Sequence, residues 1–367
     1  MTREEFIKAL STAIPRIEGK NVYIWGTGDG VILYQEGLKR LAEEGVEIYA
    51  YGSDDESLYD GKFCGKEVFS AGEIADDKKA VVLVCLETKD ARRDAVVKLR
   101  GKGIECFLLD DYVMKSHGVE ILGVYDSLCG DRSKAVFSQI VYTKIAGGDF
   151  FDNIYSQDRY FASSAFAKKN INEVFVDCGG YVGNTVETYL QKRCGVFKKI
   201  IMFEPDMGNF RAAKARRERL VKEWNIKSSD IEMYPYLVTD KDATVLTDAF
   251  ENYHGITVGS GAQIENNDTE TASTKVESRM VSLDVFLDSK EANFIKVDLN
   301  GGEYNMLLGA KETITQNKPK IAVNLSANAV NFYQIALLLK DYVPEYKFAV
   351  RHHSYEDKDT VLYAWVD

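Results

Sequence analysis

Acids and glycines gather where two strand-like runs end in the second half of the chain. Asp177 ends the run VFVD and is followed by three glycines within six residues, and Glu204 ends the run IIMFE one helix later. Glycine lets the backbone pass close to a bulky ligand, and a strand-end carboxylate can accept hydrogen bonds from both hydroxyls of a ribose. The carboxyl ends of parallel strands meet at one edge of a sheet, so we expect both acids in one cleft. A purely structural glycine turn is the alternative.

A third strand-end acid, Asp298, closes the run NFIKVD. Lys296 lies two residues earlier, so both side chains should face the same side of the strand. A strand-end carboxylate can take a proton from a bound substrate or orient the substrate by a hydrogen bond. Asp298 is our first candidate for such a general base or orienting group. Lys296 could instead neutralise it in a strand-end salt bridge, and this alternative stays open.

Three further ionisable residues are weaker candidates. Glu303 lies early in the next predicted helix, where the helix dipole favours a carboxylate, so capping is an alternative to a chemical role. His352 and His353 fall at the end of a predicted strand, and imidazole titrates near neutral pH. We read them as an exposed pair in a turn, where histidines are more often inert.

An earlier glycine loop, WGTGDG at 25–30, follows a predicted strand and opens a predicted helix. This is the place for a phosphate-binding turn, and the acids in GSDDE at 52–56 could hold a ribose hydroxyl. The third glycine of GxGxxG is absent, because position 31 is Val31. A packing turn without ligand and a dinucleotide site both remain open. The second would make the protein an oxidoreductase, but nothing downstream supports a hydride-transfer site.

These residues lie on two alternating patterns of strands and helices. Near-continuous apolar strands separated by helices indicate parallel sheets covered on both faces, and the C-terminus reads as a β-hairpin. We therefore predict an α/β protein in which a Rossmann-like sheet with a C-terminal β-hairpin follows a second, smaller Rossmann-like domain. We predict that the aromatic-rich segment between them forms helices that pack on the second domain. These helices either also line its ligand pocket or have a packing role alone. The predicted parts are a small domain at 1–117, a helical connecting or cap segment at 118–170 and the second domain at 171–367.

Composition limits the partners. The 367 residues contain 46 Lys and Arg against 57 Asp and Glu, a net charge of −11, which disfavours nucleic acid and membrane surfaces. The start MTREEFIKAL does not resemble a signal peptide, so we expect a cytoplasmic protein without membrane insertion. The six cysteines form no CxxC pair. We therefore expect no disulfide or zinc framework, and most cysteines as small buried side chains.

From about residue 119 onward the chain resembles FkbM-type S-adenosylmethionine-dependent methyltransferases. The runs that carry the resemblance are IYSQDRYF, VFVDCGGYVGNT, FEPD, MVSLDVFL, NFIKVDLNGGEYNMLLGAKETI and YKFAVRHHSYEDKDTVLYA. The resemblance implies a class I methyltransferase fold, S-adenosylmethionine as cofactor, and methyl transfer to a hydroxyl of a saccharide or saccharide-linked small molecule. The first domain resembles, more loosely, small Rossmann-like units of polysaccharide-biosynthesis enzymes.

The resemblance also assigns roles to residues. Asp177 and the glycines would cradle the methionine part of the cofactor, Glu204 would hold the ribose, and Asp240 would lie near the adenine. The candidate cofactor-binding residues are Asp177, Gly179, Gly180, Tyr181, Gly183, Asn184, Thr185, Glu204, Pro205 and Asp240. The candidate catalytic residues are Asp298, Lys296 and Glu303. We predict no metal site, a small-molecule or glycan acceptor, and leave the oligomeric state open, a homo-oligomer included.

The sequence departs from the family pattern near the expected acceptor pocket. Asn300 stands where an acid is usual, Val182 and Asn184 stand where acids are frequent, and Ala327 lies near the place of a histidine in many relatives. These changes remove acid–base groups and leave the cofactor residues intact. A cofactor-binding but catalytically impaired module in glycan biosynthesis is therefore the alternative function.

Overall fold

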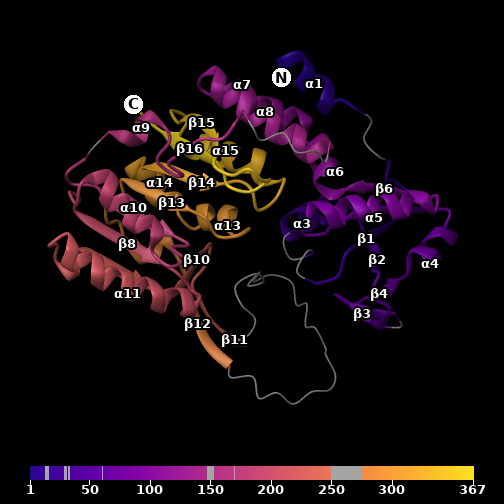
Figure 1. Cartoon of the computed structure of the whole chain (residues 1–367), viewed down its shortest axis with the longest axis horizontal. Coiled ribbons are helices and arrows are strands. Elements are labelled where there is room, and N and C mark those ends of the chain that lie inside the picture. Colours follow the sequence, from indigo (N-terminus) through magenta and orange to yellow (C-terminus); the bar gives the residue numbers. More distant parts are fainter. Residues whose placement is uncertain are drawn as a thin grey trace.

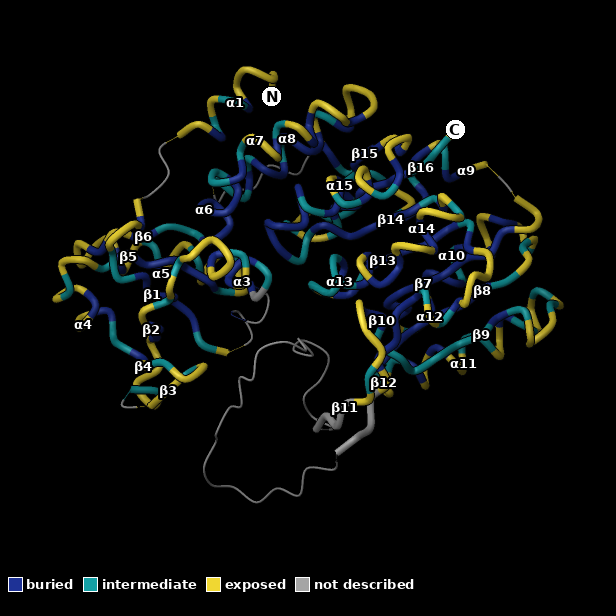
Figure 2. Tube along the Cα trace, turned by 180° about the vertical axis from the view of Figure 1, so that it is seen from behind, coloured by how far each residue is buried: buried dark blue, intermediate teal, exposed yellow. Residues whose placement is uncertain are grey.

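Two α/β units joined by a run of helices form this chain in a computed structural model (Figure 1). The structure describes all residues except 13–15, 29–30, 32–33, 60, 147–152, 169 and 249–274. Figure 2 shows that the central strands of both sheets are buried, whereas the helices that cover them have exposed outer faces. This is the layered α/β arrangement predicted from the apolar strand runs.

The first sheet has six strands in the order β3-β4-β2-β1-β5-β6. Its strands are β1 (Asn21–Trp25), β2 (Ile48–Gly52), β3 (Lys62–Phe63), β4 (Lys66–Phe69), β5 (Ala80–Val84) and β6 (Glu105–Leu108), with η1 (Glu56–Leu58) before β3. Neighbouring strands are parallel except for the β3–β4 pair. This parallel arrangement confirms the predicted Rossmann-like sheet of the smaller domain. The short β3–β4 hairpin was not predicted.

Helices cover this sheet and then lead to the second. Around the first sheet lie α3 (Gln35–Glu43), α4 (Ala71–Asp76) and α5 (Lys89–Gly101). The helical stretch that follows comprises α6 (Leu109–Ser116), α7 (Gly118–Ser127), α8 (Asp131–Ala146) and α9 (Ser164–Ala167). The N-terminal helix α1 (Arg3–Leu10) packs on this stretch, with the buried Phe6 ring 5.1 Å from that of Tyr125.

The second sheet has seven strands in the order β15-β16-β14-β13-β7-β8-β9. They are β7 (Val174–Cys178), β8 (Lys199–Phe203), β9 (Ile231–Tyr234), β13 (Phe294–Val297), β14 (Lys320–Asn324), β15 (Lys347–His352) and β16 (Thr360–Trp365). Only β16 pairs antiparallel with its neighbours. The order reverses between β7 and β13, so the loops after these strands border the crevice where open α/β sheets bind ligands. The predicted parallel sheet with a C-terminal hairpin is confirmed.

Helices α10 (Asn184–Arg193), α11 (Met207–Glu223), α12 (Leu283–Leu287), α13 (Glu303–Leu308), α14 (Lys311–Asn317) and α15 (Asn331–Tyr342) complete this unit, with η2 (Ser228–Asp230) before β9. The apolar run at 231–238 forms two strands and not one, because Pro235 divides it. Proline has no N–H for a strand ladder. After it, β10 (Tyr236–Thr239) leaves the large sheet for a three-stranded one with β11 (Ala243–Asp248) and β12 (Lys275–Ser282).

The cysteine prediction was wrong in part. All six cysteines are free thiols, but only Cys85, Cys106 and Cys178 are buried, whereas Cys64, Cys129 and Cys194 are exposed. The three buried cysteines follow or lie in strands, and the exposed ones lie in turns. Across the described ranges, no helix has the length and apolar character needed to cross a bilayer.

Candidate active site

The loop after β7 lies at the reversal point of the second sheet and is built from glycines. The amides of Gly179 and Gly180 both donate to the carbonyl of Phe203, at 3.0 and 2.9 Å. Gly179 has φ +80°, and a Cβ there would lie 1.9 Å from the carbonyl oxygen of Asp298. A Cβ on Gly180 would lie 2.2 Å from the Met202 side chain. Glycine is therefore required at position 179, where backbone blocks a Cβ, whereas a Cβ at position 180 would have to displace the Met202 side chain.

Asp177 and Lys296 form a buried ion pair beneath this loop. Their nearest side-chain atoms are 3.0 Å apart, and the two side chains are 0% and 2% exposed. Lys296 also donates hydrogen bonds to the carbonyls of Cys178 and Gly179. Burial raises the pKa of Asp177, and the lysine charge opposes that rise. Among the described residues, Asp177 Oδ2 has no hydrogen-bond partner. A buried acceptor beside a glycine loop fits a ligand that brings a hydrogen-bond donor.

Glu204 ties the glycine loop to the strand beside it. Its Oε2 accepts a hydrogen bond from the amide of Tyr181 at 2.7 Å, and its Oε1 accepts one from the amide of Asp206 at 3.0 Å. The residue is 1% exposed, and burial raises the pKa of its carboxyl. Each oxygen has a second lone pair, so the carboxylate can still accept from ribose hydroxyls. Pro205 is buried next to it.

The remaining predicted cofactor residues fall in two places. Gly183, with φ +79°, is the N-cap of α10, which places exposed Asn184 and buried Thr185 in its first turn. Tyr181 has φ +49°, and its side chain is 57% exposed beside the loop. Asp240 follows β10, and a Cβ on Gly309, at the end of α13, would lie 2.9 Å from its Cα. The backbone of Asp240 therefore lies against the end of α13, and its Oδ1 accepts from Thr239 Oγ1 at 3.1 Å.

Asp298 is held by donors from two parts of the chain. Its Oδ2 accepts from the Tyr160 hydroxyl at 2.5 Å and from Arg159 Nη2 at 2.9 Å, and its Oδ1 accepts from Asn324 Nδ2 at 2.8 Å. Its side chain is 20% exposed. Burial would raise the pKa of Asp298, but Lys296, Arg159 and the hydrogen bonds hold it below its usual value. Asp298 is therefore charged at neutral pH and is a weak base.

The sequence analysis did not single out Arg159 or Tyr160. Both lie in the run IYSQDRYF of the connecting segment, which we expected either to line the pocket or only to pack. The only feature of the sequence that could have indicated these two residues was the run itself, in which a charged and an aromatic residue are adjacent. In the structure, the segment supplies two of the three side chains that bond directly to Asp298.

Glu303 is the first residue of α13, and its carboxylate binds the loop before the helix rather than facing an open site. Its carboxylate accepts from the amides of Leu299 at 2.8 Å and Gly301 at 3.0 Å, and from Asn331 Nδ2 at 3.1 Å. The side chain is 0% exposed, and burial together with the charge of Asp298 raises its pKa to about 7. It thereby closes the loop that carries exposed Asn300, whose φ is +48°.

The histidine pair is not exposed, which corrects our expectation. His352 is 0% exposed and its Nδ1 lies 2.9 Å from Thr360 Oγ1. The His353 ring lies between the Ser156 carbonyl at 2.7 Å and the Tyr363 hydroxyl at 2.9 Å. Burial lowers the pKa of both imidazoles to about 4. Both are therefore neutral at physiological pH.

In the first glycine loop, close packing of the backbone explains why position 26 is a glycine. This residue has φ +142°, and a Cβ there would lie 2.4 Å from the carbonyl oxygen of Cys85. The acids after β2 have local partners, since Asp55 caps η1 and Asp54 pairs with Lys98. Gly30 lies outside the described residues. Close approach of β1 to the end of β5 explains Gly26 without a ligand.

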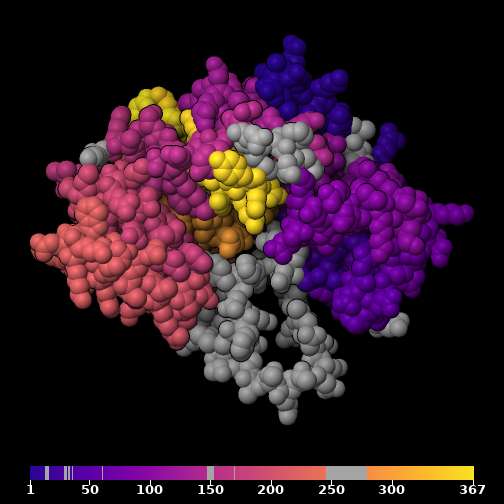
Figure 3. Space-filling view, in the orientation of Figure 1, coloured from indigo at the N-terminus to yellow at the C-terminus, as the bar shows by residue number. Residues whose placement is uncertain are grey.

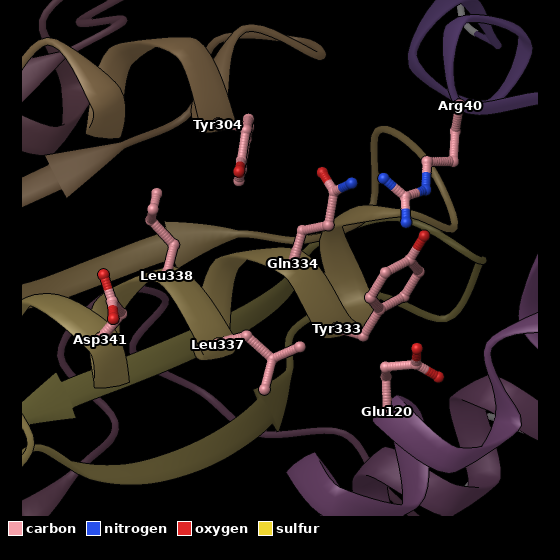
Figure 4. Close-up of a pocket in the computed structure, with 8 residues that line it drawn as sticks. All are labelled: Arg40, Glu120, Tyr304, Tyr333, Gln334, Leu337, Leu338 and Asp341. Atoms are coloured by element: carbon pink, nitrogen blue, oxygen red, sulfur yellow. The ribbon is translucent and has the colours of Figure 1, made fainter. Parts of the chain in front are cut away.

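A cavity of about 360 Å³ lies elsewhere, between the two units (Figure 4). Its lining residues are Arg40, Glu120, Tyr304, Tyr333, Gln334, Leu337, Leu338 and Asp341, none of them a predicted site residue. Figure 4 shows the Tyr333 hydroxyl pointing towards the Arg40 guanidinium. Within the described residues, no group of three or more His, Cys, Asp and Glu side chains is arranged to hold a metal ion.

Comparisons with known proteins identify a family whose model matches the part of the chain that carries this site. Residues 177–349 match the family model described as the methyltransferase FkbM domain. A crystal structure of methyltransferase FkbM from Methylobacillus flagellatus aligns with 99% of this chain and 98% of its own, at 18% identity and a TM-score of 0.60. At that identity the likeness shows a shared fold.

Two other solved structures align with 54% of this chain and 90% of their own. One is an rRNA methylase from Streptococcus thermophilus, at 13% identity and a TM-score of 0.30. The other is a putative methyltransferase from Streptococcus mutans in complex with SAH, at 8% identity and a TM-score of 0.31. Neither score supports a functional comparison. No curated protein sequence matches the chain.

Proposed function

Residues 177–349 form a methyltransferase domain of the FkbM family, and from this premise we propose that the protein transfers a methyl group from S-adenosylmethionine to a hydroxyl of a saccharide or saccharide-linked small molecule. The observation that supports the cofactor is the glycine loop after β7. Its backbone leaves no room for a Cβ at Gly179, and the buried Asp177 beneath it has an oxygen without a described partner.

We assign the cofactor to the carboxyl ends of β7 and β13, where the order of the sheet reverses. Asp177, Gly179 and Gly183 would border its methionine part, and Glu204 would accept from its ribose hydroxyls while still holding the Tyr181 amide. Asp240 would lie near the adenine. Acids suit a positively charged ligand, because opposite charges attract most strongly where water is scarce.

S-adenosylmethionine, when bound, supplies a methyl group on a positively charged sulfur. An acceptor hydroxyl would have to release its proton as it gained the methyl group, and that proton would pass to Asp298 or to water. Alignment of the acceptor provides much of the rate of such a transfer. Asp298 can accept a hydrogen bond from the hydroxyl and so orient it. Its lowered pKa argues for orientation rather than strong basicity.

Calorimetry tests the cofactor assignment. We expect the purified protein to bind S-adenosylmethionine and S-adenosylhomocysteine, and Asp177→Asn and Glu204→Gln to bind both at least about tenfold more weakly, because each removes a buried charged acceptor. Glu291→Gln, at an exposed ion pair, is the control and should bind as the natural protein does. If the natural protein binds neither compound, the cofactor proposal is wrong.

A panel of sugar nucleotides and glycosides tests the acceptor, with release of S-adenosylhomocysteine as the readout. We expect turnover with at least one member, and Asp298→Asn to lower kcat more than it raises KM for the methyl donor. An unchanged rate and pH profile in Asp298→Asn would remove Asp298 from the reaction.

A second function is favoured by one observation. The Asp298 carboxylate already accepts three hydrogen bonds, from Arg159, Tyr160 and Asn324. A carboxylate so occupied is typical of a structural site, and Asn300 stands where the family usually has an acid. Cofactor binding without turnover across the whole panel would favour a regulatory or scaffolding module in glycan biosynthesis.

The division of the chain at residues 117 and 170 is also a proposal. The N-terminal helix α1 packs on α7 and α8, so this helix belongs structurally with the connecting helices. Limited proteolysis with mass spectrometry tests the boundaries, and we expect cleavage between the sheets rather than within them.

A further inference from the structure

The carboxyl edges of the two sheets meet at one turn. Strand β15 runs parallel to β14, because both pair antiparallel with β16. The β15–β16 turn, residues 353–359, therefore lies at the carboxyl edge of the second sheet. Arg92, in the first turn of α5, donates to the carbonyls of Leu86 and Glu87 just after β5, at the carboxyl edge of the first sheet. In Figure 3 the yellow C-terminal residues lie against the violet first unit.

One ion pair joins the two edges. Arg92 Nη2 lies 2.9 Å from Asp357 Oδ2, with the two side chains 16% and 35% exposed. Arg92 also donates to the Tyr34 hydroxyl at 3.2 Å, so the guanidinium is fixed on the first unit. The Arg92 guanidinium is partly buried and bonds to two carbonyls just after β5, so the first unit holds it in place. Through its ion pair with Asp357 it therefore anchors the β15–β16 turn.

The other end of the same turn reaches the candidate active site. Asp359 Oδ1 lies 2.7 Å from Arg159 Nη2, and that nitrogen lies 2.9 Å from Asp298 Oδ2. Asp359 has φ +62°, and its carbonyl accepts from the His353 amide at 3.0 Å, which fixes the conformation of the turn. The contacts therefore run from Arg92 to Asp357, through the turn to Asp359, and on through Arg159 to Asp298.

We propose that Arg92 is a positioning residue for methyl transfer, which orients Asp298 by anchoring the β15–β16 turn. The inference rests on the proposed function and gives the first unit a part in the reaction. Arg159 is shared between Asp298 and Asp359, so its position against Asp298 depends on where the turn places Asp359. Among the described residues, Arg92 itself makes no hydrogen bond or ion pair with Asp298.

Hydrogen exchange read by mass spectrometry tests the coupling without an acceptor. We expect Arg92→Ala to speed exchange in peptides covering 353–360 and also 155–163. Arg93→Ala is the matched control, because Arg93 is the next residue of α5, is 63% exposed and pairs only with Asp90 and Asp94 of its own helix among the described residues. Faster exchange confined to α5, or the same pattern in both variants, would overturn the proposal.

Kinetics with an acceptor identified from the panel test the role in catalysis. We expect Arg92→Ala to lower kcat about tenfold at unchanged KM for the methyl donor, because misplacing a group at the reacting centre costs at least that much. Arg92→Lys should recover part of the rate, and Arg93→Ala should be normal. The effects of Arg92→Ala and Asp359→Asn should be non-additive, since they act through the same turn.

The two proposals can fail separately. If the natural protein transfers no methyl group to any acceptor, the proposed function fails, and the exchange experiment alone decides whether Arg92 controls the turn. If the protein is active but the two substitutions are additive, Arg92 does not act through the turn and the inference is wrong.

Discussion

Lys296 lies directly opposite Asp177 in the parallel pairing of β13 with β7, and their charged groups are 3.0 Å apart. The pair thus crosses the reversal point of the sheet, below the loop that we assign to the cofactor. Both side chains are almost fully buried, at 2% and 0% exposure. Burying two charges is costly unless they remain paired, so the site depends on keeping both.

Removing one partner of this pair should be strongly destabilising. We expect Lys296→Met to lower the free energy of unfolding by about 3–5 kcal/mol, because it leaves the Asp177 carboxylate buried without its cation. Urea denaturation at neutral pH measures this as a lower midpoint at unchanged slope. The double variant Asp177→Asn with Lys296→Met should recover part of the loss, since no uncompensated charge remains.

The exposed pair between Lys198 and Glu291 is the control. Its nitrogen–oxygen distance is 2.7 Å, similar to that of the buried pair, but its side chains are 55% and 44% exposed. Lys198→Met should therefore cost less than about 1 kcal/mol. Equal losses of stability in Lys198→Met and Lys296→Met would show that burial does not control the effect.

Alanine at Gly179 should disrupt both folding and cofactor binding. The added Cβ would lie 1.9 Å from the Asp298 carbonyl oxygen and would have to accept φ +80°. We expect a loss of stability of more than about 2 kcal/mol, from left-handed strain and the backbone clash together. Thermal unfolding and calorimetry with S-adenosylhomocysteine measure the two effects.

Two other glycines separate strain from clash. Gly65 has φ +75° with open space around it, so Gly65→Ala should cost only about 1–2 kcal/mol of strain. Gly123, inside α7, has ordinary torsions and open space, so Gly123→Ala should be stabilising by up to about 1 kcal/mol. If Gly179→Ala costs no more than Gly65→Ala, the loop moves freely and the close approach to Asp298 is unimportant.

The pKa of Glu303 predicts a dependence of stability on pH. The pKa rises from 4.5 to about 7 in the folded protein, so the charged form is disfavoured by folding. The stability this group contributes is complete below about pH 4.5 and is lost as the pH rises to about 7. Glu303→Gln cannot ionise. Relative to it, the natural protein should lose about 3 kcal/mol between these limits, measured by urea denaturation across the pH range.

Parallel curves for the two proteins would contradict this prediction. Asp298 carries part of the effect through its charge, so the Asp298→Asn background should show a smaller dependence on pH. That variant separates the contribution of the neighbouring charge from that of burial.

The sequence was sufficient to predict the second sheet and the position of three acids at the ends of its strands. The near-continuous apolar runs ending in Asp177, Glu204 and Asp298 are typical of buried parallel strands. The carboxyl ends of such strands lie at one edge of the sheet, so the three acids were expected there. The partners of Asp298 were not predictable in the same way. Arg159 and Tyr160 lie 139 and 138 positions away, and no local periodicity reports a contact over that distance.

Short or interrupted elements were missed for local reasons. The β3 strand has two residues, too few for an alternating pattern, and Pro235 diverts a run whose apolar residues continue on both sides of it. The exposure of the histidine pair was misjudged because its partners come from outside the hairpin or from its second strand. Ser156 of the connecting segment covers His353, and Thr360 covers His352.

The two histidines of the C-terminal hairpin should not titrate near neutral pH. Burial lowers the pKa of both His352 and His353 to about 4, so each stays neutral down to about pH 5. Because these values lie below the ordinary 6.5, the stability that the pair contributes is present above about pH 6.5 and is lost as the pH falls towards 4. Histidine-selective NMR, with His352→Gln and His353→Gln for assignment, should show two rings whose shifts are constant from about pH 8 to about pH 5.5. A midpoint near 6.5 for either ring would show that it is solvated, and would return it to the list of candidate bases.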